Sequence, residues 1–94
     1  MIFTGGTSIA KHVMKAASEN LVPLTLELGG KSPVIVGKNA KIKDTAQRVM
    51  QGKTMNAGQI CLAPDYALVP EEKVEEFVKA SVEVTSEMLS LIHI

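Results

Sequence analysis

The sequence predicts an α/β fold, in which short apolar strands alternate with amphipathic helices. Two observations carry this prediction. Apolar runs of about four or five residues end at glycine or proline, which is typical of strands. Between these runs, apolar residues recur every three or four positions over about a dozen residues, which is typical of helices covered on one side. A chain of 94 residues allows one small domain at most, with a modest core.

The first half of the chain predicts a strand, a helix and two further strands, at residues 1–4, 9–19, 24–28 and 33–36. Thr7 or Ser8 can cap the helix after a glycine turn, and Pro23 follows its end. The strand at residues 24–28 places its three leucines on one face, with Thr25 and Glu27 on the other.

The second half predicts a helix, a loop, a strand and a final helix, at residues 44–55, 57–61, 67–69 and 70–85. Asp44 is expected to cap the first of these helices. Pro70, followed by Glu71 and Glu72, is a favourable start for the second, because proline and acidic residues suit a first helical turn. The alternation of strands and helices therefore continues to the end of the chain.

Composition excludes several classes of function. The net charge is zero and aromatic residues make up 3% of the chain, so neither a basic surface nor a base-stacking platform for nucleic acid is expected. No apolar run reaches the roughly 18–20 residues that a membrane span needs. The single cysteine cannot form an internal disulfide, which favours a reducing, cytoplasmic location. His12 and His93 have no partner at metal-ligand spacing, so no metal site is predicted.

Two residues 34 positions apart suggest covalent catalysis. Cys61 lies in a loop beside small residues, and a thiol can act as a nucleophile. Glu27 sits between apolar neighbours before a glycine pair, where partial burial would suit a general base. Each residue alone has a simpler interpretation, since a lone cysteine is usually a small buried apolar residue and a strand glutamate usually faces solvent.

The turn after the first strand is a candidate phosphate site. Gly5-Gly6-Thr7-Ser8 opens a helix, whose free N–H groups and dipole attract anions. The turn lacks the G-x-G-x-x-G pattern of dinucleotide-binding proteins, and a plain strand-to-helix junction is the alternative. Lys31 is expected at the surface, or paired with a carboxylate.

Three stretches resemble the aldehyde dehydrogenase superfamily: Phe3–Thr7, Leu24–Pro33 with its Glu-Leu-Gly-Gly-Lys block, and Ala57–Cys61 with its Gly-Gln-x-Cys block. The resemblance covers about residues 2–85. The run Ala63-Pro64-Asp65-Tyr66 further resembles the branch that acts on coniferyl, fatty and aromatic aldehydes. The family resemblance implies a fragment that spans the end of the NAD-binding Rossmann-like domain (residues 1–26) and the start of the catalytic domain (residues 27–88). Residues 89–94 form an apolar segment without a cap or a charge, and we expect them to be a non-native tail.

The resemblance assigns roles to individual residues. Cys61 would attack the aldehyde, form a thiohemiacetal and, after hydride loss to NAD or NADP, carry a thioester that a water activated by Glu27 hydrolyses. The backbone of Gly5, Gly6 and Thr7 would contact the cofactor's pyrophosphate, and that of Leu28 and Gly29 would contact its nicotinamide. The family usually has serine in place of Gly6 and glycine in place of Ala10, so a hydroxyl contact to the cofactor is missing here.

The resemblance also implies that the full-length protein forms a homo-oligomer, and that the 94 residues alone have no useful turnover with an aldehyde. Three alternatives stay open. A CoA-acylating relative would pass the acyl group to CoA, although Glu27 favours hydrolysis. A nucleotide-binding module would leave Cys61 inert. A cysteine hydrolase would need a histidine base, for which neither histidine is well placed.

Overall fold

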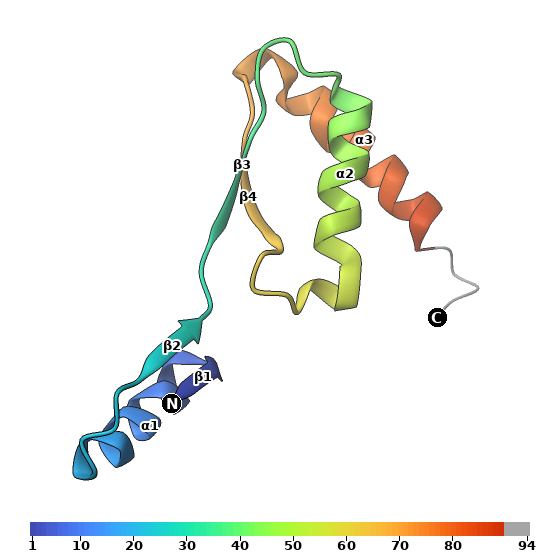
Figure 1. Ribbon diagram of the computed structural model, residues 1–94. Coiled ribbons are helices and arrows are strands. Elements are labelled where there is room, and N and C mark those ends of the chain that lie inside the picture. Colours follow the sequence, from blue (N-terminus) through green and yellow to red (C-terminus); the bar gives the residue numbers. More distant parts are fainter. Residues whose placement is uncertain (90–94) are drawn as a thin grey trace. The chain divides into compact units, whose positions relative to one another are not determined.

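The computed structural model describes residues 1–89, which form two compact units, Met1–Gly30 and the part of the chain from Lys31 onward. Each unit is described by itself, and Figure 1 shows the elements of both. Both units contain a pair of parallel strands that is joined through a helix. Parallel neighbours need such a crossover, because a tight turn can join only antiparallel strands.

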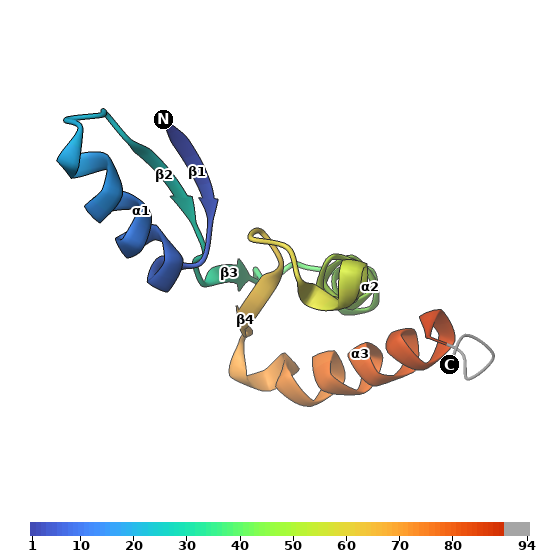
Figure 2. The ribbon, with the colours of Figure 1, turned by 90° about the horizontal axis from the view of Figure 1, so that it is seen from below.

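Unit 1 contains β1, α1 and β2, at Ile2–Gly5, Thr7–Glu19 and Thr25–Leu28. The helix lies on one face of the β1–β2 pair, as Figure 2 shows. Ala10 and Ala17 are the buried residues of α1. Their small side chains, seven positions apart, allow this side of the helix to approach the strands closely.

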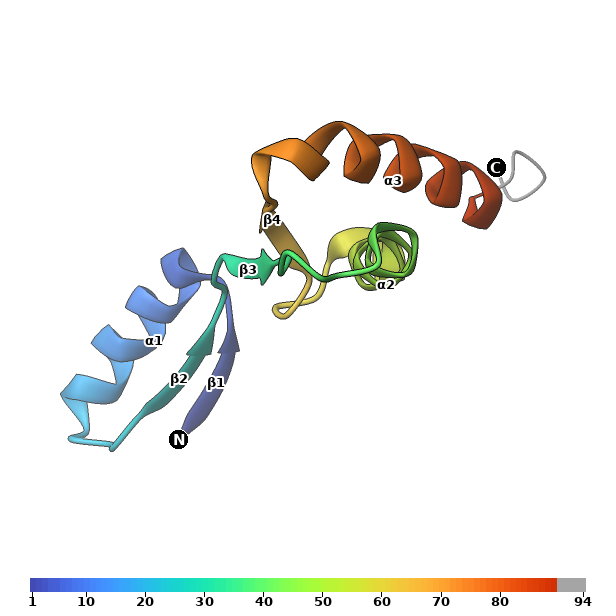
Figure 3. The same cartoon turned by 90° about the horizontal axis from the view of Figure 1, so that it is seen from above.

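Unit 2 contains β3 (Ser32–Ile35), α2 (Ile42–Thr54), η1 (Met55–Gly58), β4 (Pro64–Leu68), η2 (Glu71–Lys73) and α3 (Val74–Met88), where η denotes a 3-10 helix. Its core consists of Val36, Ile42, Ala46 and Ala80, with Phe77 partly buried against them. The two long helices pack against each other, and Figure 3 shows them side by side. Both helices contribute to the core, α2 through Ile42 and Ala46 and α3 through Ala80.

The α/β prediction is confirmed, and each expected helix is present. Two capping predictions are wrong. Asp44 is the third residue of α2, which starts at Ile42 because that side chain packs into the core. Neither Thr7 nor Ser8 caps α1, since β1 continues through Gly5, Gly6 takes the capping position, and Thr7 is already helical.

Some boundaries also differ from expectation. β4 begins at Pro64 rather than at residue 67, because its register with β3 pairs Ser32 with Pro64. The final helix has a 3-10 turn before its regular part, which starts at Val74. The expected tail at residues 89–94, and His93 with it, lies outside the described residues except for Leu89. Among residues 1–89, no helix is long and apolar enough to cross a membrane.

Candidate active site

The predicted cofactor-binding residues of unit 1 gather at one edge of its sheet. Parallel pairing sets Thr4 opposite Glu27 and Gly5 opposite Leu28, so the carboxyl ends of β1 and β2 lie together. Gly6 and Thr7 continue directly from β1 into α1, and Gly29 follows β2. Ligands of α/β proteins bind outside the carboxyl ends of parallel strands. The structure therefore brings all five predicted cofactor-binding residues to the edge where a ligand is expected.

The first turn of α1 fits an anionic group. Helix N-termini leave N–H groups without helical partners, and no side-chain oxygen caps this one. No acidic residue lies in its first turn, whereas Asp44 and Glu75 lie in the first turns of α2 and α3. The positive end of the α1 dipole thus keeps its attraction for a phosphate.

The two glycines before α1 serve different purposes. A Cβ on Gly5 would stand 2.7 Å from the Phe3 ring, so this position needs a residue without a side chain unless the ring moves. A Cβ on Gly6 would meet no atom within 4 Å, and its φ of −79° suits any residue. A serine would fit at Gly6, so the missing hydroxyl reflects this sequence rather than a steric need.

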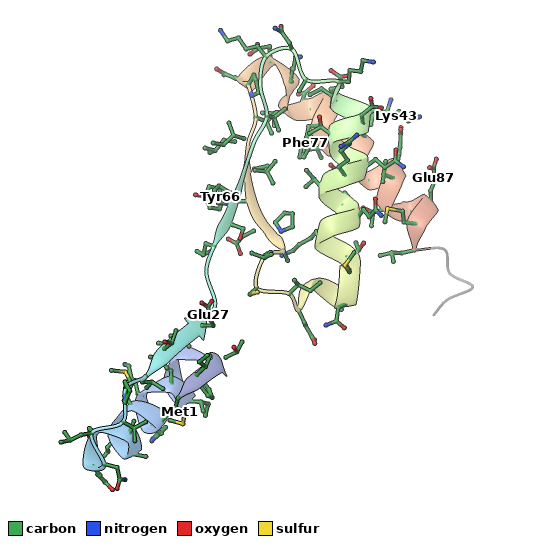
Figure 4. The ribbon with its side chains drawn as sticks, viewed as in Figure 1. Met1, Glu27, Lys43, Tyr66, Phe77 and Glu87 are labelled. Carbon is green, nitrogen blue, oxygen red and sulfur yellow. The ribbon has the colours of Figure 1, made fainter. Side chains whose placement is uncertain are left out.

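Glu27 is exposed on the face of the strand pair that α1 does not cover, beside Thr4. Its neighbours Leu26 and Leu28 alternate with it and are half-buried, which confirms the predicted faces of this strand. Figure 4 shows the Glu27 side chain near the end of β2. The predicted partial burial of this carboxylate is not found within unit 1, because a single helix covers only one face of two strands.

Cys61 belongs to unit 2 and is exposed on a tight turn. The backbone N–H of Ala63 donates to the carbonyl of Ile60 at 2.9 Å, which closes a turn with Cys61 and Leu62 at its centre. This location confirms the predicted loop between α2 and the next strand. The thiol is presented at the surface of the unit rather than packed as a small apolar residue, so the alternative of a buried structural cysteine does not apply to unit 2.

The backbone just before this turn is unusual. Asn56, Ala57 and Gly58 have positive φ values of 48°, 55° and 78°. The left-handed region costs a non-glycine residue about 1–2 kcal/mol. A Cβ on Gly58 would also lie 3.2 Å from the carbonyl oxygen of Lys53. Sequence reasoning did not predict this left-handed run, whose one sequence signal is the presence of asparagine and glycine, the residues that most readily adopt positive φ.

An ion pair joins the segments that follow the two predicted catalytic residues. Lys31 Nζ lies 2.7 Å from Asp65 Oδ2, next to the position where β3 and β4 begin to pair. The Lys31 ammonium donates a hydrogen bond to the Asp65 carboxylate, and this bond together with charge attraction holds the pKa of the Asp65 carboxyl below its ordinary value. Lys31 is thus both exposed and paired with a carboxylate. Lys31 stands four positions after Glu27, and Asp65 stands four positions after Cys61. Sequence reasoning did not predict Asp65 as the partner of Lys31.

No cluster of three metal-ligating side chains occurs within the described part of the chain. Unit 1 brings together the predicted cofactor residues and Glu27, while Cys61 lies in unit 2. An open helix start at the carboxyl edge of parallel strands is where many α/β enzymes hold the phosphates of a nucleotide cofactor.

Comparison with known proteins identifies the family. Residues 1–91 match the aldehyde dehydrogenase family. The coniferyl aldehyde dehydrogenase of Pseudomonas sp. strain HR199 is 68% identical over 78 residues, which are 83% of this chain and 16% of that protein. The chain therefore belongs to the aldehyde dehydrogenase family, and it spans about a sixth of that relative's length.

Solved structures agree with this assignment. The substrate-bound state of Staphylococcus aureus AldH is 50% identical, with a TM-score of 0.83 over 92% of this chain and 19% of that one. Aldehyde dehydrogenase C of Pseudomonas syringae, a cysteine-to-alanine variant complexed with NAD+ and octanal, is 28% identical, with a TM-score of 0.83 over 88% of this chain and 17% of that one. Each unit thus has an α/β structure that is found in this family.

Proposed function

We propose that this chain carries the nucleophile, the hydrolytic base and part of the cofactor site of an NAD(P)+-dependent aldehyde dehydrogenase, with a coniferyl-type or other aromatic aldehyde as substrate. The observation that carries the proposal is the exposed Cys61 on its tight turn, within a chain that matches the family over residues 1–91. The relative named a coniferyl aldehyde dehydrogenase supports the substrate class. The NAD+ complex of the P. syringae enzyme supports the cofactor.

Residues of unit 1 fit the cofactor. The start of α1, with Gly5, Gly6 and Thr7, would hold the pyrophosphate through backbone N–H groups, because the helix end has neither a side-chain cap nor a nearby acid. The backbone of Leu28 and Gly29, at the adjacent strand end, would contact the nicotinamide. When bound, NAD(P)+ supplies the hydride acceptor that the oxidation of an aldehyde requires.

Cys61 and Glu27 would perform the covalent steps. The Cys61 thiolate forms a bond to the aldehyde carbon, and the carbonyl oxygen becomes the oxyanion of a thiohemiacetal. Loss of a hydride from that carbon leaves an acyl thioester on the same sulfur. Glu27 accepts a proton from a water as the water attacks the thioester, and the sulfur departs as a thiolate with release of the carboxylic acid. The cysteine is thereby restored.

A hybrid enzyme tests this proposal. The aligned 78-residue segment of this chain replaces its counterpart in the Pseudomonas HR199 enzyme, and NADH formation is followed with coniferyl aldehyde. We expect the hybrid to be active and Cys61→Ser to lose about 10³-fold or more in kcat. Glu27→Gln should keep a single rapid burst of NADH and lose the slower steady state, because only thioester hydrolysis needs the base.

Other outcomes would contradict the assigned roles. A Cys61→Ser hybrid with undiminished activity would show that the thiol is inert, as in a simple nucleotide-binding module. A hybrid that turns over faster with CoA, and that is indifferent to Glu27→Gln, would indicate transfer of the acyl group to CoA rather than hydrolysis. Circular dichroism of each variant confirms that the substitution leaves the fold intact.

A further inference from the structure

The segment between α2 and the Cys61 turn contains most of the residues with positive φ in the described part of the chain. Among residues 1–89, four residues have a positive φ, and three of them are consecutive: Asn56, Ala57 and Gly58. The fourth is Leu21, in the turn after α1. Strained backbone persists only where the surrounding structure enforces it, and it concentrates at functional sites.

Two hydrogen bonds enforce this conformation. The backbone N–H of Gln59 donates to the carbonyl of Asn56 at 3.1 Å, and the Asn56 side-chain Nδ2 donates to the carbonyl of Gln59 at 3.3 Å. The two residues therefore hold each other reciprocally across the left-handed run. Asparagine also tolerates positive φ better than other non-glycine residues. Ala57 has neither advantage, so the flanking residues must impose its conformation.

The left-handed run determines the direction in which the chain enters the Cys61 turn. Gln59 leads directly into the turn that Ile60 and Ala63 close around Cys61. A change of backbone conformation at Asn56 would alter the path of the chain from Ala57 to Cys61 and would therefore move the Cys61 sulfur. A displacement of about 1 Å in a reacting group can cost about 10²-fold in rate.

We propose that Asn56 is a positioning residue for Cys61, whose side-chain amide and left-handed backbone orient the turn that presents the thiol to the aldehyde. This inference rests on the proposed function, because it assigns Asn56 to the nucleophile of that reaction. Asn56 acts through the turn and does not itself contact the reacting atoms.

Three substitutions in the hybrid enzyme distinguish the contribution of the Asn56 side-chain amide to kcat from that of its left-handed backbone. Asn56→Gly keeps the left-handed conformation readily accessible and removes the amide, whereas Asn56→Ala removes the amide and also makes the left-handed conformation more costly. Ala57→Gly is the matched control, because it eases the neighbouring left-handed residue and leaves the amide in place. We expect kcat to fall about 10- to 100-fold in Asn56→Ala, less in Asn56→Gly, and less than about twofold in Ala57→Gly. The KM for coniferyl aldehyde should change by less than about threefold, since the substrate's other contacts are kept.

Two measurements distinguish positioning from simple loss of stability. The folded fraction of each variant, measured by circular dichroism, corrects kcat for any unfolded molecules. Exchange of the Gln59 amide hydrogen in the 94-residue chain should accelerate in Asn56→Ala relative to Ala57→Gly, because the hydrogen bond from this amide to residue 56 is weakened.

The outcomes separate the two proposals. Wild-type kcat per folded molecule in Asn56→Ala, while Cys61→Ser is inactive, would overturn the positioning role and leave the proposed function standing. A parallel fall in kcat for Ala57→Gly would also overturn it, since the amide would then not be the determinant. Full activity of Cys61→Ser would overturn both proposals together.

Discussion

The burial of Ile42 explains why α2 begins two residues before its expected cap, and it leads to a quantitative prediction. Ile42 is 4% exposed in the core of unit 2, against Val36 and Ala46. Ile35 is 78% exposed in the same unit. The same substitution, isoleucine to alanine, therefore compares a core position with a surface position seven residues away.

The expected loss in the free energy of unfolding is several times larger for Ile42→Ala than for Ile35→Ala. Ile42→Ala removes three buried carbon atoms, which at about 0.8 kcal/mol each correspond to about 2.4 kcal/mol of lost transfer free energy. The cavity left beside Ala46 raises the loss in the free energy of unfolding to about 3 kcal/mol. Ile35→Ala removes the same atoms where less than a quarter of the side chain is covered. It should cost about 1 kcal/mol or less, including the weaker strand preference of alanine.

Urea unfolding of the 94-residue chain, followed by tyrosine fluorescence, measures this difference. The chain has one tyrosine and no tryptophan, and Tyr66 lies on β4, so the signal reports on unit 2 alone. Ile42→Val is the graded control, with an expected loss of about 1 kcal/mol. A larger loss for Ile35→Ala than for Ile42→Ala would refute the assignment of the core, and with it the reason given for the start of α2.

Further predictions concern charge, backbone and capping. Lys31 lowers the pKa of the Asp65 carboxyl, so the ion pair stabilises the fold above the ordinary aspartate pKa of about 3.9, and this contribution disappears as the pH falls through the lowered value. Asp65→Asn should therefore lower the urea midpoint at pH 7 slightly and leave it unchanged near pH 2; a larger effect in acid would contradict the ion pair. Gly58→Ala should cost about 1–2 kcal/mol, because φ is 78° and the new Cβ would press on the Lys53 carbonyl. Gly37→Ala, where a Cβ would meet no atom within 4 Å, is its control, and equal losses of thermal stability would refute the strain. Gly6→Ser should stabilise α1 by a few tenths of a kcal/mol through a new cap, seen as slower amide exchange in its first turn; faster exchange would indicate a clash.

Local sequence predicted the strands and the three α-helices but not the two 3-10 helices, and not always the limits of each element. The apolar periodicity of α2 and α3 and the leucine alternation of β2 depend on near neighbours in the chain, and all three predictions are confirmed. The start of β4 depends instead on its partner, because the ladder with β3 begins at Pro64, before the apolar run that marked the strand in the sequence. The start of α2 likewise depends on the core around Ile42.

In the candidate site, too, some features follow from near neighbours in the chain and others from the pairing of distant segments. The glycine-rich blocks around Glu27 and Cys61 identified the residues and predicted the family, which the match over residues 1–91 confirms. The catalytic and cofactor roles of those residues stay predictions. The pairing of Lys31 with Asp65 could not be predicted, because it arises only when β3 and β4 align in parallel.

By itself, the sequence determined the α/β class, the family and the chemical types of the candidate residues, because periodicity and short motifs are properties of neighbouring positions. Only the tertiary structure decided that Glu27 is exposed within its unit, that the predicted cofactor residues share one strand edge, and that Asn56 and Ala57 adopt left-handed backbone before Cys61. The physical reason is that burial, strand register and enforced strain depend on which distant segments pack together.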